Sequence, residues 1–198
     1  DANNHVMQRI YGVCFPTPEE LEEHLKLLEE AKDRDHRKIG KEMNLFMSDD
    51  LVGRGLPMFL PKGYTVWQEL ENYIKAKERK LGYLHVMTPC VGTVNLYKTS
   101  GHWDHYKDNM YTTVIDEEDY AVKPMNCPGG MLVYKTQPHS YRDLPLRMGE
   151  LGLVHRHELS GALHGLMRVR CFTQDDAHIF MTPEQVKDEI KGVVKLID

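Results

Sequence analysis

The chain has 198 residues, which is enough for one large domain or for one domain and part of a second. Hydrophobic residues make up 41% of it, so a substantial core can form. The net charge of −5, from 25 Lys and Arg against 30 Asp and Glu, argues against a chain that coats nucleic acid through a basic surface, and leaves room for a few local phosphate contacts.

The four cysteines, Cys14, Cys90, Cys127 and Cys171, form no C-x-x-C pair in a chain too large for a disulfide scaffold. We therefore predict reduced thiols and a cytoplasmic location. No apolar run approaches the ~18 residues of a membrane span. Residues 1–5 do not resemble a signal peptide and include no initiator Met, so we expect the chain to begin inside a longer protein or after a trimmed tag.

The first predicted helix begins at a capping box formed by Thr17 and Glu20, with Pro18 in the first helical position. Apolar residues then recur at helical spacing, as Leu21, Leu25, Leu28 and Ala31. The dense charges of residues 33–38 indicate a solvated helix face.

Short extended segments are predicted at residues 45–47 and 58–60, before a second amphipathic helix from about Tyr64 to Leu81. Gly82 is a natural stop for that helix. A strand at 83–88 follows, closed by a proline.

The second half of the chain is predicted to be rich in strands. Residues 111–115 and 120–123 form a hairpin around the acidic turn 116–119. A short helix then opens at Pro128 and runs to about Lys135.

Two long strands, 146–157 and 166–180, are joined by a loop that is too long for a tight hairpin. Residues 182–185 form another capping box, which starts a terminal helix towards Asp198. Long antiparallel strands flanked by helices predict an α+β fold built on an antiparallel sheet.

The strand predicted from 166 to 180 carries an unusual row of side chains. In extended chain every second side chain shares a face. That face would carry Arg168, Arg170, Phe172, Gln174, Asp176 and His178. This set of groups is unsuited to a hydrophobic core, since it includes two cations, an amide, a carboxylate and an imidazole. It is well suited to a binding surface for a charged aromatic ligand beside a metal.

Antiparallel pairing would bring Arg156 and Arg168 to the same end of the sheet, where arginine forks match phosphate oxygens. Phe172 could stack on a purine, and Glu158 could accept from an exocyclic amine. These residues fit a nucleoside triphosphate laid across the sheet. The alternative is a solvated face whose Arg and Glu residues pair across strands. The chain has no Gly-rich phosphate loop, so side chains and a metal would hold the triphosphate.

Cys127 and His178 have the donor types that zinc favours. Cys127 lies at a predicted helix start, where a thiolate is favoured. The alternative is a buried cysteine and an unrelated histidine. Asp176 shares a face with His178 and could bind an ammonium or hydroxyl group of a small ligand held at the metal.

Taken together, these segments resemble the class II aminoacyl-tRNA synthetases, and within them the threonyl-tRNA synthetase family. The first class signature corresponds to residues 82–89, and the second to 156–158 with 168–172. The marks of the threonyl type are residues 8–12, 101–104, 125–129, 160–168 and 175–178.

The resemblance implies a role for each matching residue at an ATP site that also takes Mg²⁺. Arg156 would contact the α-phosphate and Arg168 the γ-phosphate. Glu158 would read the adenine amine, and Phe172 would stack on the ring. His102 matches a histidine that assists transfer to the tRNA ribose.

The resemblance also implies a zinc site that selects threonine. Cys127 and His178 would be two of three protein ligands, with a third beyond this chain. The amino and hydroxyl groups of threonine would bind the zinc, Asp176 would fix the hydroxyl, and Met125 and Gln174 would lie nearby. Valine is excluded because it has no hydroxyl to offer the metal.

Residues 1–198 would then be the front part of a catalytic domain, with the third signature, the editing domain and the anticodon-binding domain outside it. The parent enzyme would activate threonine with ATP, transfer it to tRNA, form a homodimer through the 65–89 region and stay off membranes. The piece alone is expected to bind zinc weakly or not at all, and the resemblance leaves its activity in isolation open.

Three alternatives remain open. A seryl- or prolyl-tRNA synthetase does not need the pair Cys127 and His178. A non-catalytic binding paralogue would be expected to lose Arg156, Arg168 or Phe172, and all three are present. A zinc hydrolase would be expected to carry a ligand cluster such as H-E-x-x-H, which this sequence lacks.

Overall fold

The structure, a computed structural model, describes residue 8 and residues 10–198. Its helices are α1 Pro18–Asp33, α2 His36–Glu42, α3 Pro61–Lys80, α4 Val94–Thr99, α5 His102–Tyr106, α6 Cys127–Tyr134 and α7 Val186–Ile197. Its strands are β1 Phe46–Met47, β2 Met58–Phe59, β3 Leu84–His85, β4 Val91–Thr93, β5 Thr112–Ile115, β6 Glu118–Val122, β7 Leu146–His155 and β8 Cys171–Phe180. The mixed α+β class predicted from the sequence is confirmed.

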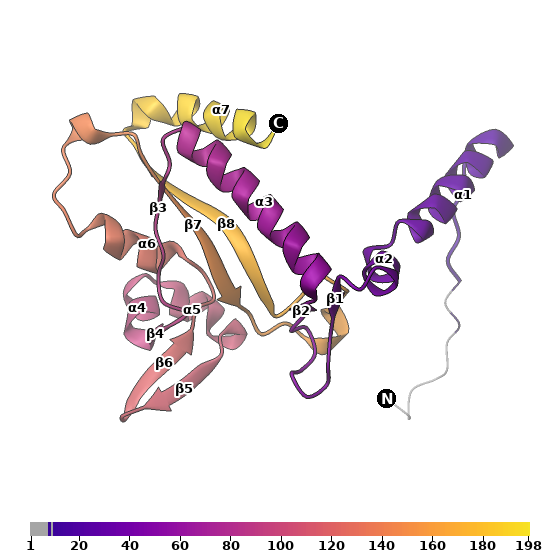
Figure 1. The fold of residues 1–198 in the computed structure, drawn as a ribbon, viewed down its shortest axis with the longest axis horizontal. Helices are drawn as coiled ribbons and strands as arrows, with labels where there is room; N and C mark the ends of the chain where they lie inside the picture. Colours follow the sequence, from indigo (N-terminus) through magenta and orange to yellow (C-terminus); the bar gives the residue numbers. More distant parts are fainter. Residues whose placement is uncertain (1–7, 9) are drawn as a thin grey trace.

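The central sheet has the strand order β3-β7-β8 (Figure 1). β7 and β8 pair antiparallel over ten residues each, from Leu146 opposite Phe180 to His155 opposite Cys171. β3 adds a short parallel pair to β7, so the sheet is not wholly antiparallel. Since side chains alternate along β8, the two faces of this sheet have different neighbours.

Helices cover the two faces of β8. Side chains of α3 form a groove with Thr173 and Asp175 of β8. On the opposite face, Cys127 at the start of α6 meets Asp176 and His178. α7 lies next to the end of α3, where Lys77 donates to the carbonyl of Leu196.

The predicted bounds of the two long strands are partly wrong. β7 ends at His155, two residues before the predicted end, and β8 begins at Cys171, five residues after the predicted start. Gly165 has a φ of 50°, and a bridge between His164 and Arg168 turns the chain back on itself. Residues 156–170 therefore form a folded loop in place of strand ends.

A smaller sheet has the order β4-β6-β5. The predicted acidic turn of 116–119 is shorter than expected, because Asp116 and Glu117 alone make the connection, with φ values of 51° and 64°. Two central residues at positive φ match the twist of a two-residue hairpin. This lets Glu118 and Asp119 join β6. Behind the sheet lies a buried apolar cluster of Val94, Tyr97, Met110 and Ala121.

The N-terminal helices confirm the predicted start signals. The Thr17 hydroxyl accepts from the Glu20 amide at 3.3 Å, and α1 carries no buried residue. The charged run after it is solvated and paired locally, with Lys38 Nζ 2.8 Å from Asp33. α3 begins at Pro61, three residues before the predicted start, since proline suits the first helical position. Within the described part of the chain, no helix combines the length and the apolar character needed to span a bilayer.

Gly63 and Gly192 are a matched pair for testing how closely α3 packs. A Cβ at Gly63 would lie 1.9 Å from the Leu45 carbonyl oxygen, whereas one at Gly192 in α7 would meet nothing within 4 Å. Gly63→Ala is therefore expected to destabilise the fold by about 1–3 kcal/mol through overpacking. Gly192→Ala is expected to stabilise it by roughly 0.5–1 kcal/mol. Urea unfolding measures both, and equal effects at the two positions would contradict the packing described.

Candidate functional site

A cavity of about 420 Å³ lies between α5, the start of α6 and the beginning of the 156–170 loop. It is lined by His102, Tyr106, Asn109, Pro124, Met125, Cys127, Arg156 and Glu158. Five of these are site residues predicted from the sequence, and they come from segments up to 56 positions apart, from His102 to Glu158. The fold thus gathers residues that were singled out in separate motifs.

Arg156 is held from two sides. Its Nε donates to the Pro124 carbonyl at 3.0 Å, and its guanidinium carbon lies 5.2 Å from the ring centroid of Phe172. The ring is a favourable neighbour for the cation. These contacts fix the direction of the side chain, whose remaining N–H groups can serve an anion in the cavity.

Arg168 and Glu158 form an ion pair, with Nη2 2.8 Å and Nε 3.0 Å from Oε2. The Arg168 side chain is 58% exposed. The prediction that Arg168 and Arg170 continue the strand face is wrong, because both precede β8. Arg170 instead donates to the Glu158 carbonyl, and this contact joins the two ends of the 156–170 loop. Through the loop, Arg168 still meets one other predicted nucleotide ligand, Glu158.

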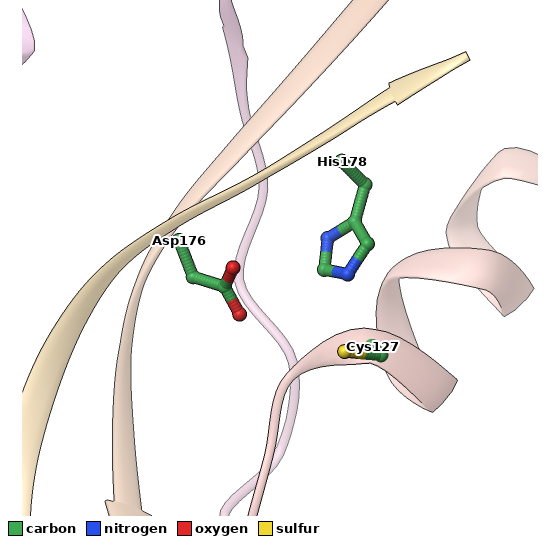
Figure 2. Close-up of side chains that lie close together, drawn as sticks. All are labelled: Cys127, Asp176 and His178. Carbon is green, nitrogen blue, oxygen red and sulfur yellow. The ribbon is translucent and has the colours of Figure 1, made fainter. Parts of the chain in front are cut away.

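Cys127, Asp176 and His178 form a cluster that could hold a metal ion (Figure 2). One ligand atom from each lies within 4.8 Å of the other two, and all three residues are partly buried. Thiolate, imidazole and carboxylate are the donors that zinc accepts in proteins. The sequence predicted Cys127 and His178 as metal ligands with Asp176 beside them, and the structure brings the three side chains together.

The thiol of Cys127 does not have the depressed pKa expected at a helix start. Burial raises the pKa of this thiol, and the nearby Asp176 carboxylate raises it further. These two effects outweigh the backbone hydrogen bond at Cys127 and the nearby Arg156 guanidinium, which both lower this pKa. A metal that binds here would have to displace the thiol proton.

Asn126 supports this cluster and was missed by the sequence analysis. It is 1% exposed, and its Nδ2 donates to Asp176 at 3.1 Å. A Cβ at Gly152 would lie 2.0 Å from the Asn126 Oδ1, so the amide occupies the space that this glycine leaves on β7. The only sequence signal for this supporting role was that Asn126 directly precedes Cys127.

A buried ion pair underlies the site and was also missed. Lys123 Nζ lies 2.9 Å from Glu150, and each side chain is 5% exposed. Thr88 donates its amide and its hydroxyl to Glu150, both at 2.9 Å. The available signal was a carboxylate within the apolar and glycine residues from Met148 to Val154, where a buried acid needs a partner.

The remaining predicted residues are placed as follows. His102 is the first residue of α5, and its Nδ1 lies 2.8 Å from the Ser100 hydroxyl. Met125 lines the cavity. Gln174 stands opposite Gly152 in β8, and alternation puts it on the same face as Asp176.

Residues 111–198 match the tRNA synthetase class II core domain (G, H, P, S and T). The whole chain is 62% identical to a threonine–tRNA ligase of Clostridium botulinum strain 657 over 198 residues. It is 64% identical over 195 residues to that of Desulforamulus reducens. The chain spans 31% of the length of each of these relatives.

Solved structures share the fold. The RNA-binding domain of threonyl-tRNA synthetase from Cryptosporidium parvum Iowa II superposes with a TM-score of 0.79 at 43% identity, over 82% of this chain and 40% of that one. Prolyl-tRNA synthetase of Giardia lamblia, in complex with prolyl-adenylate, gives 0.73 at 22% identity, over 82% and 34%. The second likeness is one of fold alone.

Proposed function

We propose that this chain, which belongs to the class II aminoacyl-tRNA synthetases of the threonyl type, forms the ATP- and threonine-binding front part of a threonine–tRNA ligase. The parent enzyme would join threonine to AMP and then transfer it to tRNA. The observation that carries the proposal is the single cavity shared by His102, Met125, Cys127, Arg156 and Glu158. Two alternatives, a seryl or a prolyl enzyme, leave the nearby Cys127, Asp176 and His178 cluster without a role.

ATP would lie with its adenine on Phe172 and its α-phosphate at Arg156. Arg168 would reach the γ-phosphate by leaving Glu158, which frees the carboxylate to accept from the adenine amine. The Arg168 side chain of this pair is 58% exposed, which limits how much the ion pair contributes to stability. Mg²⁺ bound to the phosphates would accompany the nucleotide.

Threonine would bind at the other end of the cavity. Cys127 and His178 would hold a zinc ion together with a third protein ligand from outside residues 1–198. When bound, zinc supplies an open position for a hydroxyl group, which threonine has and valine lacks. Asp176 would fix that hydroxyl, and Met125 and Gln174 would border the substrate.

In this reaction the protein would align threonine and ATP, without forming a covalent bond to either substrate. The threonine carboxylate attacks the α-phosphorus, the bond to pyrophosphate breaks, and Arg156 stabilises the charge that develops. His102, fixed by Ser100, is placed beside the cavity to assist the later transfer to the tRNA ribose.

The parent protein is proposed to be a cytoplasmic homodimer that meets its second copy through the 65–89 region. Exposed apolar side chains of α3 and of the segment after it support this surface, among them Leu70, Tyr73 and Met87. The activity is proposed for the parent protein, because residues 1–198 span 31% of the length of the curated relatives.

The test of this function is pyrophosphate exchange by the full-length protein. Exchange is expected with threonine and not with serine or proline at equal concentration. Arg156→Ala is expected to lower the exchange rate by about a hundredfold, since one group that stabilises developing charge is lost. Arg34→Ala, at the exposed residue that follows α1, is the control and should leave the rate unchanged. Exchange with proline or serine alone would identify a different amino acid.

A further inference from the structure

The 156–170 loop is fastened near its tip by a histidine from the N-terminal part of the chain. The backbone N–H of Leu166 donates to Nε2 of His36 at 2.9 Å, across 130 positions of sequence. Since Leu166 supplies the hydrogen, Nε2 of His36 must be the unprotonated nitrogen of a neutral ring. His36 is the first residue of α2, so this short helix holds a loop from the second half of the chain.

The contact is so close that it requires a glycine beside it. Gly165 has a φ of 50°, and a Cβ there would lie 2.1 Å from Nε2 of His36 and 2.9 Å from Cγ of Arg37. Any side chain at 165 would push the imidazole away. Gly161, in the same loop, has open space within 4 Å, so the crowding is local to the contact with His36.

The ring of His36 is itself oriented by its surroundings. It stacks on Phe46, with ring centroids 6.3 Å apart and planes 23° apart. The other ring nitrogen lies 3.7 Å from Asp35, which is beyond hydrogen-bond distance. The Asp35 carboxylate instead accepts from the amide and the guanidinium of Arg37. The nitrogen that faces Leu166 therefore has the loop amide as its partner.

Arg168 is tied to the same tip. His164 and Arg168 exchange two backbone hydrogen bonds, of 3.1 and 3.2 Å, so that residues 164–168 form one closed turn. Leu166, the residue that His36 holds, lies in the middle of this turn. At the base, Arg170 is held separately by the Gly55 carbonyl. Loss of the His36 contact would release the turn and Arg168 but leave the base attached.

We propose that His36 is a positioning residue for the ATP site, which acts by holding the 164–168 turn so that Arg168 faces the terminal phosphate. This rests on the proposed function for the identity of the ligand. The contact itself is independent of that function. The expected signature is selective: affinity for ATP depends on His36, while affinity for threonine, bound at the far end of the site, does not.

The test uses the full-length protein with two substitutions of His36. His36→Leu removes the acceptor and is expected to raise KM for ATP about three- to tenfold, the range for one lost hydrogen bond, with KM for threonine unchanged. His36→Gln keeps an acceptor oxygen and should recover most of this loss. Gly165→Ala, which displaces the ring and also strains the backbone at a φ of 50°, should act like His36→Leu, whereas Gly161→Ala, in open space of the same loop, should behave as wild type.

Hydrogen–deuterium exchange of the loop gives a readout that does not depend on catalysis. Faster exchange of residues 164–168 is expected in His36→Leu and Gly165→Ala, but not in His36→Gln. If the wild type lacks threonine-dependent exchange of pyrophosphate while the loop still loosens in His36→Leu, the proposed function fails, and the finding that His36 holds the 164–168 turn stands. Equal loop protection and equal KM for ATP in His36→Leu and wild type would overturn the positioning role.

Discussion

Replacing Cys127 by serine in the full-length protein is expected to remove its zinc and to lower threonine-dependent pyrophosphate exchange by about 10⁴-fold, the range for a site that loses its partner for a substrate hydroxyl. The thiol lies within 4.8 Å of Asp176 and His178 and lines the cavity that also holds Arg156. Serine keeps the size of the side chain but is a poor zinc ligand. Metal analysis and exchange assays on the purified protein measure both effects.

Cys14→Ser is the matched control, because Cys14 is exposed and lies far from the cluster in sequence. It should retain both zinc and activity. Since burial and Asp176 raise the pKa of the Cys127 thiol, protons compete with the metal at higher pH than for an ordinary thiol. Zinc affinity is therefore expected to fall as the pH is lowered. Stoichiometric zinc and normal exchange in Cys127→Ser would show that this thiol is not a ligand.

Replacing Lys123 by methionine is expected to destabilise the protein by about 3–5 kcal/mol, because it leaves the charge of Glu150 buried without its partner. Both side chains are 5% exposed, and the pair lies 2.9 Å apart. A loss of this size is a large part of the roughly 5–15 kcal/mol that stabilises a typical domain. Chemical unfolding of the full-length protein, followed by a probe in this domain, measures it.

The double substitution Lys123→Met with Glu150→Leu removes both charges and should recover much of the lost stability. Lys32→Met provides the contrast, because its ion pair with Glu29 is fully exposed. No measurable change is expected there. If Lys123→Met were as harmless as Lys32→Met, the pair could not be buried as described.

Local signals in the sequence predicted the elements that depend on local chemistry. The Thr17 cap, the stop at Gly82, and the hairpin of β5 and β6 follow from neighbouring residues, and the structure confirms them. Alternation correctly placed Phe172, Asp176 and His178 on one face, because β8 is regular over that range.

Contacts between distant segments could not be predicted in the same way. The alternating pattern predicted that the last long strand begins at residue 166, whereas β8 begins at Cys171. No local signal showed that His36 would hold Leu166 in a turn. The pairing of Lys123 with Glu150 likewise depends on the packing of separate strands. The Asn126 amide fills a space that exists only because Gly152 lies opposite it on β7.

The pairing of β8 with β7 has a consequence for the two ligands. Phe172 and His178, proposed for the adenine and for the metal, are carried by this one ribbon, paired on one side by β7 within the described residues. Loss of this pairing would loosen both subsites together. Substitutions that weaken the pairing of β8 with β7 should therefore reduce affinity for nucleotide and amino acid in parallel, unlike those in the 156–170 loop.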